Sequence, residues 1–261
     1  MLSAKRKSDG QTVNAYSASR NEGPFACLVC SEAVVLRAGR SRINHFAHEN
    51  PIACKFASGE TDEHRRCKQA IYEALKRSSQ VEDAELERAL GEVRPDVFAR
   101  IRGVSVAIEV QISSLSLETI TSRTIEYARK GIYVLWLLPW TSELDRPRYA
   151  PSNWERWIHA TYFGRVYYWI EDLKVVPYRF ESDFVSVPRR SWYGPGGSRQ
   201  VGGGYSRAST RYRRPARGKQ LDLVADFAPC TRYWKDAGGL RLPDARLFTQ
   251  DLEGRRGRAT A

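Results

Sequence analysis

VRPDVFARIRGVSVAIEVQIS, residues 93–113, carries the clearest structural pattern in the chain. Apolar residues alternate with other types on both sides of Arg102 and Gly103, which predicts two strands joined by a turn at that pair. With the turn centred between these residues, Asp96 lies directly opposite Glu109 on the neighbouring strand. Directly opposed side chains have Cβ atoms about 5 Å apart, so the segment predicts two carboxylates in close proximity.

Two neighbouring carboxylates repel each other, and burial in a strand rich in Val and Ile increases the cost. A divalent cation between them removes the repulsion, since Mg²⁺ takes oxygen ligands from one or two carboxylates together with phosphate and water. We therefore expect Asp96 and Glu109 to hold Mg²⁺, or Mn²⁺ in its place. The alternative is an exposed edge hairpin with solvated carboxylates, and a slip of one residue would also move Asp96 to the other face.

A helix is predicted ahead of the hairpin, from Ser58 as N-cap to about Arg77. Its apolar residues recur at spacings of three and four, and this stripe extends backwards onto Glu60 and His64, with Lys68 on its margin. Polar groups that continue an apolar stripe face the same interior surface, which makes this end of the helix a candidate site. The alternative is that the first turn emerges into solvent and these side chains form an exposed ladder.

The segments around the hairpin complete a predicted α/β core. A second helix is expected from Ser116 to about Lys130, and the apolar run IYVLWLL that begins at Ile132 is expected to be a buried strand. With VEDAELERAL, residues 81–90, as the first strand, the order is helix, strand, strand, strand, helix, strand. This order is the common core of PD-(D/E)xK nucleases, in which helices flank a mixed sheet.

A cluster of cysteine and histidine residues precedes this core. FACLVC contains a CxxC pair, NHFAH contains an HxxH pair, and a further cysteine follows, so the candidate ligands are Cys27, Cys30, His45, His48 and Cys54. Thiolate and imidazole are the ligands that tetrahedral Zn²⁺ selects, and four of the five would suffice. We favour His48 over His45, although the spacing does not decide between them. The alternative is a degenerate finger with reduced cysteines and core histidines.

Composition limits the classes of protein to which the chain can belong. It has 261 residues, of which 42% are hydrophobic, and its formal charge is +12, which favours one main globular domain with a polyanionic partner. The apolar run from Ile132 to Trp140 is far shorter than the roughly 20 residues that cross a bilayer. The basic N-terminus has no apolar stretch behind it, so we expect a cytoplasmic protein with reduced cysteines and no membrane partner.

Changes in composition divide the chain into five expected parts. They are a loose leader (1–23), a small zinc module (24–57), the nuclease-like core (58–187), a flexible basic linker (188–219) and a short C-terminal segment (220–261). The linker is rich in Gly, Ser, Arg and Tyr, a composition that suits phosphate attraction and base stacking on single-stranded DNA. The residues expected to bind nucleic acid are Arg207, Arg211, Arg213, Arg214, Arg217 and Lys219. The alternative is a solvated spacer with no partner.

Taken in series, these motifs resemble the CoiA-like competence proteins of bacteria. FACLVC, NHFAH, RPDV, IEVQIS, IEYARKGIYVLWLL and FGRVYYW occur in the order seen in that family, within about residues 25–180. The resemblance implies a PD-(D/E)xK-type nuclease core and a role in processing or recombining DNA. It also implies that Glu60 adds to the metal site of Asp96 and Glu109.

The resemblance places Gln111 where most such nucleases carry a lysine. A neutral amide orients water by hydrogen bonds but does not stabilise developing negative charge as an ammonium does, so Lys68 or His64 is expected to contact the phosphate instead. The expected function is a Mg²⁺-dependent endo- or exodeoxyribonuclease. The alternative is a non-catalytic DNA-binding accessory protein with a degenerate site, which recruits recombination proteins.

Overall fold

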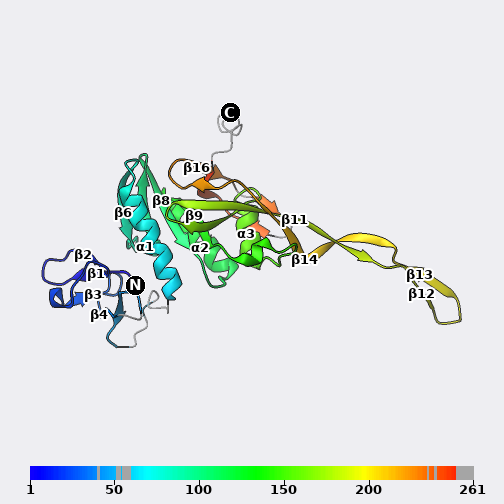
Figure 1. The fold of residues 1–261 in the computed structure, drawn as a ribbon, viewed down its shortest axis with the longest axis horizontal. Coiled ribbons are helices and arrows are strands. Elements are labelled where there is room, and N and C mark those ends of the chain that lie inside the picture. The colour runs from blue at the N-terminus through cyan, green and yellow to red at the C-terminus, as the bar shows by residue number, and fades with distance from the viewer. Residues whose placement is uncertain (40–41, 51–53, 55–59, 234, 238–239, 251–261) are drawn as a thin grey trace.

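A computed structural model describes residues 1–39, 42–50, 54, 60–233, 235–237 and 240–250. The chain forms a small N-terminal sheet, a large mixed sheet with three α-helices, and a long two-stranded ribbon that extends away from the large sheet (Figure 1). The α/β class that the sequence predicts is confirmed. None of the helices in the described ranges is long and apolar enough to cross a membrane.

The N-terminal sheet is antiparallel and has the order β2-β1-β3-β4-β5. Its elements are β1 (Ser3–Arg6), β2 (Thr12–Asn14), the 3₁₀ helix η1 (Arg20–Glu22), β3 (Phe25–Ala26), β4 (Ala33–Arg37) and β5 (His45–His48). The structure differs here from the loose leader expected at residues 1–23, because β1 and β2 belong to this sheet and Leu2 and Ala4 are fully buried. Strands this short show too few alternations for a periodic pattern.

The core of the large sheet follows the predicted order of elements. That order is α1 (Asp62–Arg77), β6 (Val81–Leu86), β7 (Val97–Ile101), β8 (Val104–Val110), α2 (Leu117–Arg129) and β9 (Tyr133–Pro139). The hairpin register is also confirmed, since Val97 pairs with Ile108 and Ile101 pairs with Val104. Arg102 and Gly103 both have positive φ, the backbone conformation of the tight turns that match strand twist.

The start of α1 differs from the prediction. The expected N-cap, Ser58, lies outside the described residues, and the helix begins at Asp62, where Thr61 is the N-cap and its hydroxyl accepts from the His64 N–H at 3.2 Å. Glu60 therefore precedes the helix and does not lie one turn before His64 on its surface.

The remaining elements follow β9 along the chain. They are η2 (Ser142–Asp145), α3 (Asn153–Thr161), β10 (Val166–Glu171), β11 (Lys174–Val187), β12 (Arg190–Tyr193), β13 (Arg199–Gly202), β14 (Tyr205–Arg217), β15 (Leu221–Asp222), β16 (Phe227–Arg232), β17 (Lys235–Ala237), β18 (Leu240–Leu242) and β19 (Ala245–Gln250). Of these, β10, β11, β14, β15, β16 and β19 belong to the large sheet, whereas β12 with β13 and β17 with β18 form separate two-stranded sheets. Helix α1 packs against β6 and β7, α2 against β9 and β19, and α3 against β10.

Two parts of the C-terminal half differ from the expectation. Residues 188–219 are not a flexible linker, because β12 pairs with β13 and β14 pairs with β11 to form the ribbon in Figure 1. Within the expected C-terminal segment, β15, β16 and β19 add to the large sheet, and β19 runs parallel to β9 with Leu247 opposite Val134. Leu247 and Phe248 are buried in the same core as Trp136, so this segment is part of the globular unit.

Candidate active site and metal centres

Lys68 is the centre of the candidate active site. Its side chain on α1 is fully buried, and its Nζ lies 2.5 Å from Glu60 Oε1, 2.5 Å from Glu87 Oε1 and 3.5 Å from Asp96 Oδ1. Glu60 lies two residues before the start of α1, Glu87 directly follows β6, and Asp96 directly precedes β7. The fold therefore brings three acidic side chains from separate segments around one ammonium group.

The charges of this cluster stabilise one another. Burial alone lowers the pKa of Lys68, but Glu87, Asp96 and Glu60 outweigh it and raise that pKa above its usual range. Burial alone raises the pKa of Glu87, but Lys68 and then Arg94 outweigh it and hold that pKa far below its usual range. Both groups are therefore charged across the neutral range.

Asp96 is held on two sides. Its Oδ2 lies 3.0 Å from His64 Nε2 and accepts the backbone N–H of Val110 at 2.9 Å. Burial raises the pKa of Asp96, but Lys68 and His64 outweigh it and lower that pKa well below the usual range. The same contact raises the pKa of His64 against the effect of its own burial. Asp96 is thus a carboxylate in a fixed orientation between α1 and β8.

Glu109 has separate partners on α2. The Tyr127 hydroxyl donates to Glu109 Oε1 at 2.5 Å, and the Arg123 guanidinium donates to the same oxygen. Burial, with the nearby Asp96 adding to it, raises the pKa of Glu109 to about 7 despite the opposing charge of Arg123. This carboxyl group therefore changes its charge near neutral pH in the absence of a metal ion.

The structure brings together four of the six predicted catalytic residues, which are Glu60, His64, Lys68 and Asp96. Glu109 directly follows Ile108, the partner of Val97, as the predicted register requires. Its carboxylate, however, contacts Arg123 and not this group. The side chain of Gln111 donates to the carbonyl oxygen of Ser113 at 2.6 Å, just beyond the end of β8. Repulsion between Asp96 and Glu109 thus does not require a divalent cation, because protein cations lie beside both.

Sequence reasoning missed Glu87, Arg123 and Tyr127. Glu87 lies within the expected strand at residues 81–90, but β6 ends at Leu86 and Glu87 follows it with positive φ, so strand alternation does not indicate that its side chain is buried. Helical periodicity does put Tyr127 on the apolar face of α2, but it does not indicate that the Tyr127 hydroxyl donates to Glu109. Arg123 is the site residue that the sequence indicates least, since a charged residue at the margin of an amphipathic helix is usually solvated.

The acidic cluster offers ligands of the right type for a divalent cation. One ligand atom each from Glu60, His64 and Asp96 lies within 4.8 Å of the others. Carboxylate oxygens suit Mg²⁺ and Mn²⁺, whereas an imidazole nitrogen suits a transition metal better than Mg²⁺. Glu60 Oε2 is buried and accepts no hydrogen bond among the described residues, but it lies 3.3 Å from the N-terminal ammonium of Met1 and 3.8 Å from Arg65 Nε, so a metal ion there would meet two positive groups of the protein.

The Cys/His cluster forms a second candidate metal centre in the N-terminal sheet. One ligand atom each from Cys27, Cys30, His48 and Cys54 lies within 4.8 Å of the others, and Cys30 Sγ is 3.3 Å from His48 Nε2. His45 is apart from this group, because its Nδ1 lies 2.7 Å from the carbonyl oxygen of Ile43. Three thiols and one imidazole fit a tetrahedral zinc ion, and they are the four ligands that the sequence favours.

The six basic residues predicted to bind nucleic acid lie on β14 or directly after it. Arg207, Arg211, Arg214, Arg217 and Lys219 are exposed, whereas Arg213 is half-buried and donates to the backbone of Ser209 and Tyr212. Five of the six side chains are therefore accessible to a binding partner, whereas the Arg213 side chain hydrogen-bonds to the backbone of its own strand.

Comparison with known proteins places both parts of the chain in one family. Residues 8–57 match the family described as "Competence protein CoiA, N-terminal domain", and residues 60–158 match "Competence protein CoiA, nuclease-like domain". The curated "Competence protein CoiA" of Bacillus subtilis (strain 168) is 29% identical over 117 residues, which are 44% of this chain and 31% of that relative. The match thus spans about a third of the relative's length.

No solved structure matches the chain. The two family matches meet at the boundary between the Cys/His cluster and α1, where the structure changes from one sheet to the other. The match to the nuclease-like domain contains the whole Lys68 cluster together with Glu109 and Arg123. The chain therefore belongs to the CoiA-like family of competence proteins, with a nuclease-like domain behind an N-terminal Cys/His module.

Proposed function

We propose that this protein is a metal-dependent deoxyribonuclease that hydrolyses phosphodiester bonds during DNA processing or recombination. The observation that carries the proposal is the buried group of Lys68 with Glu60, Glu87 and Asp96. A buried ion-pair network adds little stability compared with apolar packing, so its presence in a nuclease-like domain favours a chemical role. Strongly perturbed pKa values at the same place support this interpretation.

Asp96 and Glu60 would hold the metal ion, with His64 as a further candidate ligand, and Glu109 would join them only if its carboxylate leaves Arg123. A divalent ion bound there supplies a water of lowered pKa and polarises a phosphate oxygen. Lys68 keeps its positive charge at neutral pH and would stabilise negative charge that develops on the phosphate. Gln111 would orient a water molecule, for which its amide must leave the carbonyl group of Ser113.

DNA is the proposed substrate because the chain carries a formal charge of +12 and a run of exposed arginines. Such residues bind phosphates and release counterions, which gives affinity without sequence preference. The competence family to which the chain belongs is consistent with DNA as partner and with recombination proteins as further partners.

A second candidate function is non-catalytic DNA binding. Each acidic residue of the site already contacts a cation of the protein, Asp96 through His64 and Glu109 through Arg123. Gln111 also replaces the lysine expected of such nucleases. In this case the nuclease-like domain would bind DNA and recruit other proteins without cleaving it.

A cleavage assay separates the two functions. Linear, circular, single-stranded and double-stranded DNA are incubated with the protein and either Mg²⁺ or Mn²⁺, and cleavage of circles identifies an endonuclease. We expect cleavage by the native chain and none by Asp96→Asn, which keeps the shape of the side chain. Asp83→Asn is the matched control, because Asp83 is a half-exposed acid on the neighbouring strand β6.

Equal cleavage by Asp96→Asn and by the native chain would reject the catalytic proposal. Absence of cleavage by every protein, with DNA binding retained, would support the non-catalytic function. Circular dichroism checks that each variant is folded.

A further inference from the structure

The ribbon beyond the large sheet has no role in the proposed active site. Strands β11 and β14 pair as far as Val187 opposite Tyr205, and β12 and β13 continue the ribbon to a turn at residues 194–198. We call residues 184–208 the arm. Figure 1 shows the arm extending away from both sheets, on the opposite side of the molecule from the N-terminal module.

The arm leaves the body at a firmly anchored point. Asp183, which is 8% exposed, accepts from Arg148 Nη2 at 2.5 Å and from Nε at 2.7 Å. Arg156 donates to the carbonyl oxygens of Thr210 and Arg211 at 3.1 and 3.0 Å. These contacts fix both strands at the base, so the direction of the arm is set by the globular body.

The two faces of the arm are both open to solvent. Its large apolar side chains are unusually exposed: Phe184 is 62%, Trp192 53%, Tyr193 76% and Tyr205 56% exposed. A two-stranded ribbon without a covering layer is only marginally stable in water, and exposed aromatic residues mark interaction surfaces. The arm therefore has the features of a binding element.

The charge of the arm selects a polyanionic partner. Residues 184–219 contain no Asp or Glu, and the arm itself carries Arg189, Arg190, Arg199 and Arg207, all of them exposed. A second copy of this chain is disfavoured as the partner, since each copy carries a formal charge of +12.

The arginines point to both faces of the ribbon. Arg190 pairs with Gly202 and Arg199 pairs with Tyr193, so alternation along the strands places Arg190 and Arg199 on opposite faces. A single strand of nucleic acid would follow one face and leave the other unpaired. A partner with two negatively charged walls would contact both.

Two glycines fix the backbone of the arm where β13 leads into β14. Gly203 has a φ of +86°, and a Cβ added there would lie 2.2 Å from the carbonyl oxygen of Pro188. A Cβ on Gly202 would lie 2.9 Å from the ring of Trp192, which covers that glycine. The sequence thus specifies a defined shape at the point where β11 and β14 give way to β12 and β13.

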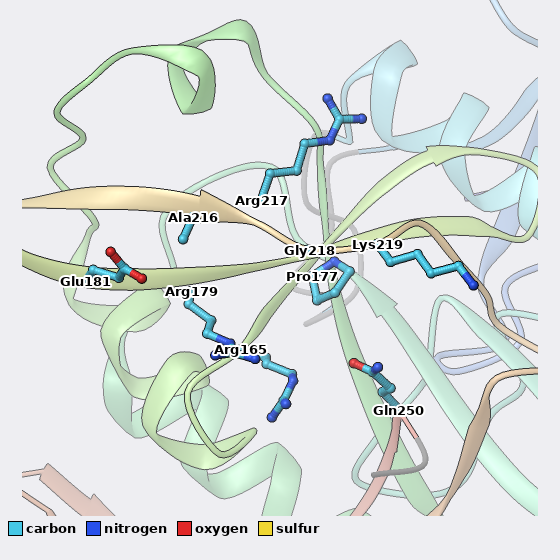
Figure 2. A pocket seen from close by; sticks show the side chains of 9 residues that line it. All are labelled: Arg165, Pro177, Arg179, Glu181, Ala216, Arg217, Gly218, Lys219 and Gln250. Carbon is cyan, nitrogen blue, oxygen red and sulfur yellow. The ribbon is translucent and has the colours of Figure 1, made fainter. Parts of the chain in front are cut away.

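A basic hollow lies at the base of the arm. It has a volume of about 250 Å³ and is lined by Arg165, Arg179, Arg217 and Lys219, among other residues. Figure 2 shows Arg165 and Arg179 extending to the same side of β11, whereas Arg217 points to the other side. The only acidic residue that lines it, Glu181, lies 3.8 Å from Arg214 across the ribbon. The cationic surface therefore continues from the arm onto the body.

We propose that the arm binds double-stranded B-form DNA by lying in its major groove, with the basic hollow against the adjoining phosphate backbone. The major groove of B-DNA is about 12 Å wide and admits a two-stranded ribbon, whose two faces then meet the two groove walls. The major groove of duplex RNA is too deep and narrow for this. The inference deepens the proposed function, because it names the form of DNA presented to the protein, but it does not depend on cleavage.

The test is a binding measurement on the full chain with three labelled probes, which are duplex DNA, single-stranded DNA of the same sequence and duplex RNA. No divalent metal is added, so that binding is measured without cleavage. The first variant combines R190Q, R199Q and R207Q. Its matched control combines R77Q, R88Q and R129Q, which removes the same charge from exposed ion pairs elsewhere.

A second variant removes residues 188–204, which we call the outer arm, and substitutes no charged residue in the rest of the chain. Val187 and Tyr205 are strand partners, so an Asn-Gly turn replacing residues 188–204 closes the ribbon between them. Anchoring by Asp183 and Arg156 is retained, and thermal unfolding checks that the body is unchanged.

We expect the native chain to bind duplex DNA more tightly than either other probe. The arm variants should lose at least about tenfold in affinity, and the salt dependence of the triple variant should fall by about 2.7 in log–log slope, which corresponds to three phosphate contacts. The control triple variant should keep both affinity and slope.

Equal loss in the control, preference for the single strand or duplex RNA, or unchanged binding after removal of the outer arm would each overturn the inference. A dimer in sedimentation that dissociates when the outer arm is removed would assign the arm to self-association instead. Cleavage assays are read separately: a protein that binds through the arm but never cleaves contradicts only the proposed function.

Discussion

Glu87 Oε1 lies 2.5 Å from the Nζ of Lys68, and both side chains are almost completely buried. The other carboxylate oxygen, Oε2, accepts the backbone N–H groups of Leu2 and Ser3 at 2.9 and 3.1 Å. One carboxylate therefore connects the N-terminal sheet with α1. This link makes the stability of the nuclease-like domain depend on contacts with the preceding module.

Replacing Lys68 by methionine should strongly destabilise the protein, because it leaves buried carboxylates without their shared cation. We expect a loss of about 3–5 kcal/mol in the free energy of unfolding, as for other broken buried pairs. Urea unfolding followed by circular dichroism measures this loss. Lys76→Met on the same helix is the control, since Lys76 is exposed and should change stability by less than about 0.5 kcal/mol.

Zinc content should depend on four specific residues of the N-terminal module. We expect about one zinc ion per purified chain, and its loss in Cys27→Ser and in Cys54→Ser, because the tetrahedral set then lacks a ligand. His45→Ala and Cys67→Ser should retain the ion, since neither side chain belongs to the group within 4.8 Å. Elemental analysis provides the measurement, and zinc loss in His45→Ala would show that the wrong histidine has been assigned.

Gln111→Lys should increase the rate of DNA cleavage. An ammonium group at this position adds a positive charge beside the carboxylates, and one such electrostatic contact is typically worth about 100-fold in rate. Single-turnover cleavage of linear duplex DNA measures the effect, with Ser113→Lys as a control two residues along. A rate no higher than that of the control would mean that Lys68 already supplies the charge.

His159 should make the protein less stable below neutral pH. Burial, followed by the charges of Arg213 and Arg165, lowers the pKa of His159 below its ordinary value of 6.5, and its Nε2 accepts the Phe180 N–H at 3.2 Å. The unfolded chain therefore binds the proton more readily, and this contribution is present above pH 6.5 and is lost as the pH falls through the folded pKa.

The measurement is the free energy of unfolding between about pH 5 and pH 8 for the native chain and for His159→Gln. Glutamine does not titrate, so the variant should show a shallower dependence on pH in this range. Two parallel curves would contradict the assignment.

The sequence predicted those parts of the fold that depend on local pattern. Alternation around Gly103 predicted the register that pairs Val97 with Ile108, and helical periodicity predicted most of α1. The alternation works because one face of each strand is buried, so a slip of register would expose apolar residues.

Features that depend on distant partners could not be predicted in this way. Leu247 and Val134 pair across more than a hundred residues, and neither segment alone indicates the other. Glu87 and Lys68 each have an ordinary local context, and only the folded chain brings them together. The arm was missed for a different reason, because neither of its faces is buried and its strands therefore show no apolar alternation.

The position of β19 has a consequence for the synthesis of this protein. The edge of β9 beside Val134 receives Leu247, which leaves the ribosome long after β9 itself. Until then the nascent nuclease-like domain exposes an unpaired strand edge and the apolar surface that Leu247 and Phe248 later cover. Folding of this domain is therefore completed only after translation of the arm, and an incomplete chain would be a ready substrate for chaperones or for aggregation.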